Sequence, residues 1–160
     1  NTLDEAIISM LRQNYTLAIG ESTAEEIKIS VGSALPLEQE LKIDVKGRDL
    51  VDGLPKVVRI GSPEVREAIE PIVLQMEDTI RSTIEHTPPE LVRDIVDQGI
   101  VLTGGTSQLR GLDMRFADAL NVPVHVAEQP LYSVAMGLGK ILEKPEDKNS
   151  ISIMVERQGS

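Results

Sequence analysis

The chain has 160 residues, 41% of them hydrophobic and only 2% aromatic, so it is long enough for one domain or two small subdomains with an aliphatic core. Its net charge of −10 argues against nucleic-acid binding through a basic surface and against a polybasic membrane patch. The sequence has no cysteine, which excludes disulfides, thiolate metal sites and cysteine nucleophiles, and its two histidines do not suggest a metal cluster.

Two amphipathic helices are predicted at the start of the chain. Apolar residues recur on one helical face from Leu3 to Leu11, which predicts a helix over residues 3–14. Residues 22–25, Ser-Thr-Ala-Glu, match a capping box, so a second helix is expected to begin there and to end at Gly32.

A small sheet is predicted after these helices. Residues 41–46 alternate between apolar and charged, the pattern of a half-buried strand. Residues 47–49, Gly-Arg-Asp, are expected to turn the chain, and a second strand is expected at 56–60.

A long helical pattern follows the sheet. Ser62 and Pro63 form a typical helix start, and apolar residues then recur at helical spacing as far as Ile84. Because Pro71 lacks an amide hydrogen, we expect a kink or break near Glu70 and place a subdomain boundary there. A bent helix within a single domain is the alternative.

The rest of the chain alternates between helix and strand, which predicts an α/β fold class with parallel strand pairing. A capping box at 87–90 begins a helix that ends before Gly99. The next predicted elements are a strand at 100–103, a helix at 109–120, a strand at 122–126 and a helix at 131–142. Residues 144–160 are charged and irregular, and we expect a mobile tail.

The sequence Thr-Gly-Gly-Thr-Ser at 103–107 follows a predicted buried strand. In open α/β sheets, ligands bind beyond the carboxyl ends of strands, where glycines leave the backbone uncovered. The following amides and the hydroxyls of Thr106 and Ser107 could bind polar or anionic groups. The spacing matches neither the Walker A nor the dinucleotide motif. A tight turn that serves packing remains the alternative.

The sequence Glu-Glu-Ile-Lys at 25–28 is the second candidate. Glu25 and Lys28 are three residues apart and are therefore neighbours on a helix. Ile27 and Val31 are expected on the buried side, which leaves the charged pair beside a groove or in water. A surface ion pair and a ligand contact are both compatible with this pattern.

Four segments, at 3–34, 45–56, 87–113 and 123–143, resemble the later half of the MreB family, bacterial actin-like proteins that determine rod shape. The resemblance implies half of a ribonuclease H-like, actin-like ATPase fold with a smaller α+β subdomain. It implies an outer, IIB-like subdomain at 1–70, a cleft-lining, IIA-like α/β subdomain at 71–143, and a flexible tail at 144–160. A first domain is expected to precede Asn1.

The resemblance also implies which residues contact nucleotide. In the actin and heat-shock chaperone superfamily, the second domain contributes a glycine loop at the adenosine and a helix with a Glu/Lys pair near the base and ribose. The third glycine common in MreB proteins is replaced here by Thr106, as in actin. The implied cofactor-binding residues are Glu25, Glu26, Ile27, Lys28, Gly104, Gly105, Thr106 and Ser107.

By the same resemblance, the chain is the nucleotide-binding half of an ATPase that forms membrane-associated filaments controlling cell shape and wall elongation. The cofactor is ATP, with magnesium bound mainly by the first domain, so the fragment alone is expected to be inactive. Expected partners are further copies of the protein, assembled head to tail, and the cell-wall elongation machinery. The expected location is the cytoplasm, at the inner face of the cell membrane, with the first domain making the membrane contact. The alternative is a metabolite kinase or a non-filamentous ATPase of the same superfamily.

Overall fold

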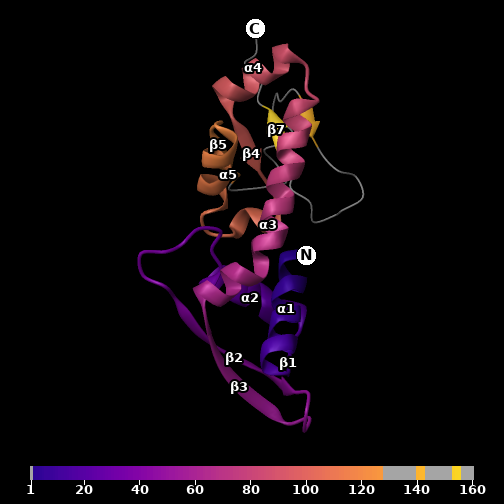
Figure 1. Ribbon diagram of the computed structural model, residues 1–160, viewed down its shortest axis with the longest axis vertical. Coiled ribbons are helices and arrows are strands. Elements are labelled where there is room, and N and C mark those ends of the chain that lie inside the picture. Colours follow the sequence, from indigo (N-terminus) through magenta and orange to yellow (C-terminus); the bar gives the residue numbers. More distant parts are fainter. Residues whose placement is uncertain (1, 128–139, 143–152, 156–160) are drawn as a thin grey trace. The chain divides into compact units, whose positions relative to one another are not determined.

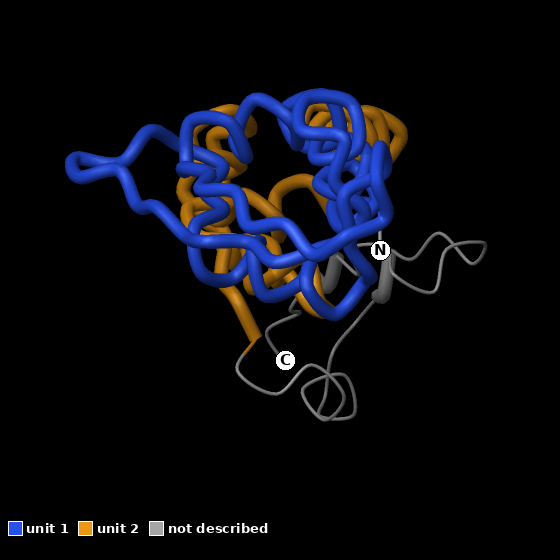
Figure 2. Tube along the Cα trace, turned by 90° about the horizontal axis from the view of Figure 1, so that it is seen from below, with its two compact units in different colours: residues 1–73 blue, residues 74–160 orange. Residues whose placement is uncertain are grey.

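The computed structural model describes residues 2–127, 140–142 and 153–155 (Figure 1). The chain divides into two compact units, Asn1–Val73 and Leu74–Ser160, which Figure 2 shows in different colours. Each unit is described by itself below.

The first unit contains two helices that pack on each other. Helix α1 covers Thr2–Tyr15 and α2 covers Glu21–Val31, so both predicted helices are confirmed. The predicted capping box is wrong, because the cap of α2 is the extended Gly20, which has no side chain to accept a hydrogen bond from the amides of the first turn. The apolar residues buried in these helices are Leu3, Ile7, Met10, Leu11, Ala24, Ile27 and Val31.

An antiparallel sheet completes the first unit. Its strands β1 (Leu17–Ala18), β2 (Lys42–Asp49) and β3 (Pro55–Gly61) lie in the order β1-β2-β3, and β2 and β3 form the long hairpin in Figure 1. Both predicted strands are confirmed.

The turn predicted at 47–49 is wrong, because these residues continue β2 and pair with β3 or β1. A Cβ on Gly47 would lie 2.5 Å from the backbone oxygen of Ala18. The glycine therefore allows β1 to approach closely rather than turning the chain.

Helix α3 extends over Ser62–Glu85. Its predicted start is confirmed. Of the kink or break expected near Glu70, the break is wrong, because the helix continues through Pro71. A proline removes one helical hydrogen bond. Ile69 and Val73, on either side of it, are fully buried, and the packing of both turns offsets that loss.

The second unit includes the end of α3 and a mixed sheet. Strands β4 (Ile100–Leu102) and β5 (Val124–Val126) are parallel, which confirms the predicted pairing. Helix α5 begins later than predicted, because a short 3₁₀ turn and the left-handed Gly111 (φ 79°) precede it. The elements are α4 (Pro89–Gln98), β4 (Ile100–Leu102), the 3₁₀ turn η1 (Gly105–Gln108), α5 (Leu112–Leu120) and β5 (Val124–Val126).

The capping box predicted before α4 is also wrong. The Thr87 hydroxyl donates a hydrogen bond of 2.6 Å to the backbone oxygen of Thr83, which lies in the preceding helix. The cap position of α4 is Pro88. The prediction of a helix here is nevertheless confirmed.

Two further strands, β6 (Lys140–Leu142) and β7 (Ile153–Val155), complete the sheet, and the strand order is β5-β4-β7-β6. The helix predicted at 131–142 is wrong at its end, because β6 (Lys140–Leu142) pairs antiparallel with β7 (Ile153–Val155). The irregular tail predicted at 144–160 is wrong for β7, whose apolar residues also pair with β4. A partner strand satisfies the backbone of these short segments. The rest of both predictions lies outside the described residues.

Candidate functional site

The residues at 25–28, here called the α2 segment, present different side chains to different surroundings. Glu25 and Glu26 are exposed, whereas Ile27 and Lys28 are each only 1% exposed. Among the described residues, no ion pair joins Glu25 to Lys28. The expectation that the charged pair lies beside a groove or in water is therefore wrong for Lys28.

Lys28 is paired with an acid from another helix. Its Nζ lies 3.1 Å from Oδ1 of Asp4, and the two side chains are 1% and 11% exposed. The distance is that of an ion pair, although the angles do not satisfy a hydrogen bond and Oδ1 has no hydrogen-bond partner in the described part of the chain. The pair joins the first turn of α1 to the last turn of α2.

A different pattern in the sequence indicates this pair, although the spacing between Glu25 and Lys28 does not. Asp4 precedes Ile7 and Leu11 by three and seven residues, so it lies on the apolar face of α1. Lys28 lies between the buried Ile27 and Val31 on α2. One acid and one base, each on an apolar face, indicate a buried pair between two packed helices.

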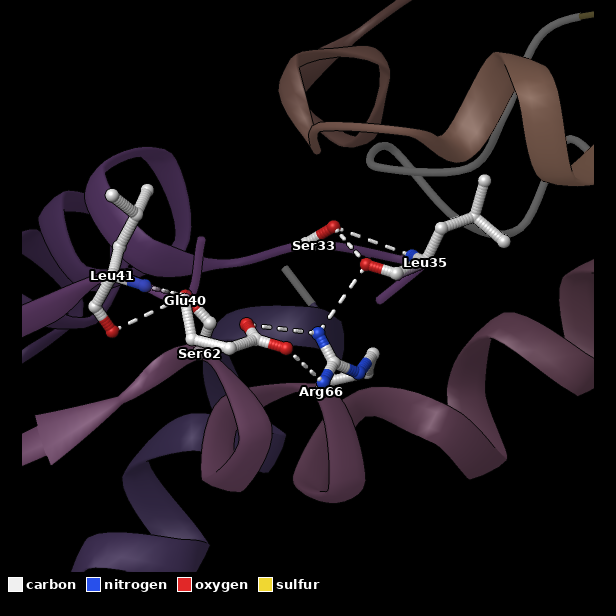
Figure 3. A network of polar contacts seen from close by, with 6 residues as sticks. All are labelled: Ser33, Leu35, Glu40, Leu41, Ser62 and Arg66. Carbon is white, nitrogen blue, oxygen red and sulfur yellow. Dashed lines mark hydrogen bonds and ion pairs between the residues drawn. The ribbon is translucent and has the colours of Figure 1, made fainter. Parts of the chain in front are cut away.

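The loop after α2 is anchored to the start of α3 by a network of polar contacts (Figure 3). Arg66 donates to the backbone oxygen of Leu35 at 3.3 Å and to Oε1 of Glu40 at 2.8 Å. The Ser62 hydroxyl accepts a bond from the Leu41 amide at 3.1 Å. Sequence reasoning missed this network, because its residues are distant in the chain and have no shared motif.

The network also affects a titration. The hydrogen bond from Arg66 lowers the pKa of the Glu40 carboxyl below its usual value, against the opposing effect of desolvation. The loop is thus held more firmly when Glu40 is ionised.

The residues at 104–107, here called the glycine loop, follow β4 directly. Gly104 has φ 85° and ψ −175°, a conformation that essentially only glycine adopts. Gly105 is exposed, and the 3₁₀ turn begins there. The Ser107 hydroxyl donates to the backbone oxygen of Gly104, so Ser107 stabilises the loop internally.

Thr106 differs from Ser107 in its hydroxyl. The residue is only 2% exposed, and its Oγ1 has no hydrogen-bond partner among the described residues. Burying a hydroxyl without a partner costs about 1–3 kcal/mol. The loop therefore combines an uncovered backbone with a buried polar atom that could accept or donate a further bond.

The two segments differ in the polar groups that they contain. The glycine loop offers backbone groups and a hydroxyl, and the α2 segment offers two exposed carboxylates and one buried ammonium. The two segments belong to different units.

In the described part of the chain, no cluster of three or more acidic or histidine side chains could hold a metal ion, and no helix is long and apolar enough to cross a membrane.

Comparisons with known proteins show what the chain is similar to. A family model described as MreB/Mbl protein matches residues 1–150. The chain is 43% identical over 140 residues to the cell shape-determining protein Mbl of Bacillus subtilis and 44% identical over 140 residues to MreB of Escherichia coli. Each alignment covers 88% of this chain but only 42% and 40% of the relative, so the chain spans less than half of their length.

The fold has a solved counterpart. MreB5 of Spiroplasma citri, solved bound to ADP and bound to AMPPNP, matches with a TM-score of 0.75 and 36% identity. The match to the ADP-bound structure covers 82% of this chain and 40% of that one. The chain thus has a mixed α/β fold that corresponds to part of the actin-like fold of MreB.

Proposed function

Because the chain belongs to the MreB/Mbl protein family, we propose that it forms the nucleotide-binding second half of an actin-like ATPase. The observation that carries this proposal is the glycine loop, where a glycine-only backbone conformation stands beside the unpartnered buried hydroxyl of Thr106. The ADP and AMPPNP bound by MreB5 of Spiroplasma citri support a nucleotide as the ligand.

The proposed contacts come from two segments. The backbone of Gly104 and Gly105, with the hydroxyls of Thr106 and Ser107, would contact one side of the nucleotide. The α2 segment would contact it with Glu25, Glu26 and Lys28, and with the backbone at Ile27. In this assignment, residues 1–70 correspond to the outer subdomain, IIB-like, and 71–143 to the cleft-lining subdomain, IIA-like.

The cofactor of the whole protein would be ATP, which supplies the phosphoryl group when bound. Phosphoryl transfer depends on correctly positioned phosphates and magnesium. We assign their positioning to the first domain of the family. The residues of this chain would bind and orient the nucleoside part. We therefore expect binding without hydrolysis by this chain alone.

At the level of the whole protein, we propose filaments built head to tail on the inner face of the cell membrane. They would act with the cell-wall elongation machinery and control cell shape, as expected of a cell shape-determining protein. Membrane contact is assigned to the first domain.

Nucleotide binding by this chain can be tested by NMR. With millimolar ADP or AMPPNP, we expect shifts of the amide signals of Gly104, Gly105 and Lys28. The amide of Gly53, at the turn of the hairpin, is the internal control and should not move. Signals at all three site residues that stay unchanged would contradict the proposed site.

Filament formation requires the protein at the full length of its relatives. Electron microscopy in the presence of ATP and magnesium should show filaments. Nucleotide binding without any filament would favour a non-filamentous ATPase instead.

A further inference from the structure

The buried ion pair between Asp4 and Lys28 gives a role to a residue outside the proposed nucleotide contacts. Lys28 belongs to the α2 segment, whereas Asp4 lies on α1. Nζ and Oδ1 are 3.1 Å apart, and Lys28 is among the largest side chains that are fully buried. In the described part of the chain, Asp4 is the acidic side chain within ion-pair distance of Lys28.

Packing of α1 on α2 does not explain why these charges are present. Removing two charges from water is costly, and well-packed apolar side chains of similar volume are often as stabilising or more so. The other buried residues of α1 and α2 are all apolar, and they include Leu3, Ile7 and Ile27. A leucine and a methionine could therefore fill the core at these two positions, so packing alone does not account for the charges.

A lysine side chain is flexible, and a ligand that immobilises it loses affinity through side-chain entropy. Asp4 imposes that restriction before any ligand binds. The ammonium has three donors, and a single carboxylate oxygen cannot occupy all of them. A ligand oxygen that reaches the buried ammonium would find donors left over, and would bind them without a further loss of freedom in the side chain.

We propose that Asp4 is a positioning residue, which holds the ammonium of Lys28 ready for the oxygens of a bound nucleoside diphosphate. The inference rests on the proposed function, because it takes Lys28 as a nucleotide contact. Asp4 itself touches Lys28 and not the ligand.

The first test is Asp4→Asn, which keeps the size of the side chain and removes its charge. We expect the dissociation constant for ADP to rise about three- to tenfold, the effect of immobilising one long side chain on binding. Carbon relaxation at Cε should show that Lys28 becomes more mobile without nucleotide. The matched control is Glu5→Gln, an exposed residue on the same helix turn, which should change neither value.

A double-mutant cycle separates positioning from simple destabilisation. Lys28→Met should weaken ADP binding, and adding Asp4→Asn to that variant should weaken it no further. An additive second loss would overturn the inference, as would unchanged or tighter binding by Asp4→Asn alone. If Lys28→Met leaves the affinity for ADP unchanged, or if the wild-type chain does not bind ADP, the proposed contact itself fails and the inference fails with it.

A measurement on the wild-type chain covers the case in which Asp4→Asn does not fold. Without nucleotide, Cε of Lys28 should be far more restricted than Cε of the exposed Lys46 in the same unit. Addition of ADP should leave that restriction unchanged. Equal mobility of the two lysines, or a restriction that arises only with ADP, would overturn the inference.

Discussion

The α2 segment and the glycine loop differ in which atoms they make available to a ligand. In the α2 segment, Lys28 is a buried side chain whose position depends on Asp4 in another helix. In the glycine loop, Gly104 contributes backbone only, and its conformation depends on the bonds that Gly104 and Ser107 make within the loop. The first arrangement therefore depends on packing between helices, and the second on a local backbone conformation.

This difference has consequences for mutation. The position of Lys28 in the α2 segment can be altered by a mutation on another helix, because its ion-pair partner Asp4 lies on α1. A change in the glycine loop acts where it is made, because φ and ψ belong to one residue. The predictions below test that contrast, beginning with the change of greatest expected effect.

Asp4→Ala should have the largest effect on stability. It leaves the buried ammonium of Lys28 without its charge partner, and breaking a buried pair from one side costs about 3–5 kcal/mol. Urea denaturation monitored by NMR signals of the first unit would measure the loss. Asp4→Leu combined with Lys28→Met should restore stability to within about 1 kcal/mol of the wild-type chain. A double variant as unstable as Asp4→Ala would show that the charges stabilise the fold.

Gly104→Ala should have the next largest effect. A side chain at φ 85° and ψ −175° is strained, at a cost of about 1–3 kcal/mol in the free energy of unfolding of the second unit. The control is Gly20→Ala, where the backbone is extended and a Cβ would meet nothing within 4 Å. Urea denaturation should show a change below about 0.5 kcal/mol for that control. Equal losses in the two variants would mean that the conformation of Gly104 is unimportant.

Thr106→Val should act in opposite directions on stability and on binding. Removing an unpartnered buried hydroxyl should raise the free energy of unfolding by about 1 kcal/mol. Loss of a nucleotide contact should weaken ADP binding roughly two- to tenfold, both quantities being measured on the same sample. Ser107→Ala provides the contrast, because its hydroxyl is bonded to Gly104 and its loss should destabilise the loop. Unchanged ADP affinity in Thr106→Val would remove that hydroxyl from the site.

The sequence predicted the helices and most strands because periodicity reports which face of an element is buried. Residues 3–14 and the run from Ser62 carry that signal over several turns, and the structure has α1 and α3 there. Both capping boxes failed, because the observed caps, Gly20 and Pro88, have no side chain that can bond the first turn. A serine or threonine followed three residues later by a glutamate is too common a pattern to locate a helix start by itself.

The errors share a physical cause, which is a partner that lies far away in the sequence. The sequence predicts a turn at Gly47, whereas β1 pairs with β2 beside this residue and comes close to it. Lys28 was paired with Glu25, its neighbour on the helix, whereas its partner Asp4 lies on α1. Residues 140–142 were predicted to be helical, although β7 gives them a partner strand. Periodicity contains no information about which elements meet.

The site followed the same rule. The glycine pair is recognisable in the sequence because glycine is required by the local backbone at Gly104. The unpartnered hydroxyl of Thr106 could not be predicted, since it depends on which residues surround the loop. Whether the two segments share one ligand stays a prediction, which the ADP titration tests.

The smallest effect concerns the loop that follows the α2 segment. The pKa of Glu40 is lowered in the folded chain by its bond from Arg66, so the unfolded state binds a proton more readily. The stability from this pair is therefore present above the unfolded pKa, whose ordinary value is 4.5, and is lost as the pH falls through the lower folded value. Glu40→Gln should flatten the fall in stability below about pH 4.5, measured by urea midpoints at successive pH values. Glu38→Gln removes an exposed charge from the same loop and is the control. It should leave the change of stability with pH as it is in the wild-type chain. An equal flattening in this control would mean that the overall charge of the loop, and not the bond to Arg66, causes the fall in stability.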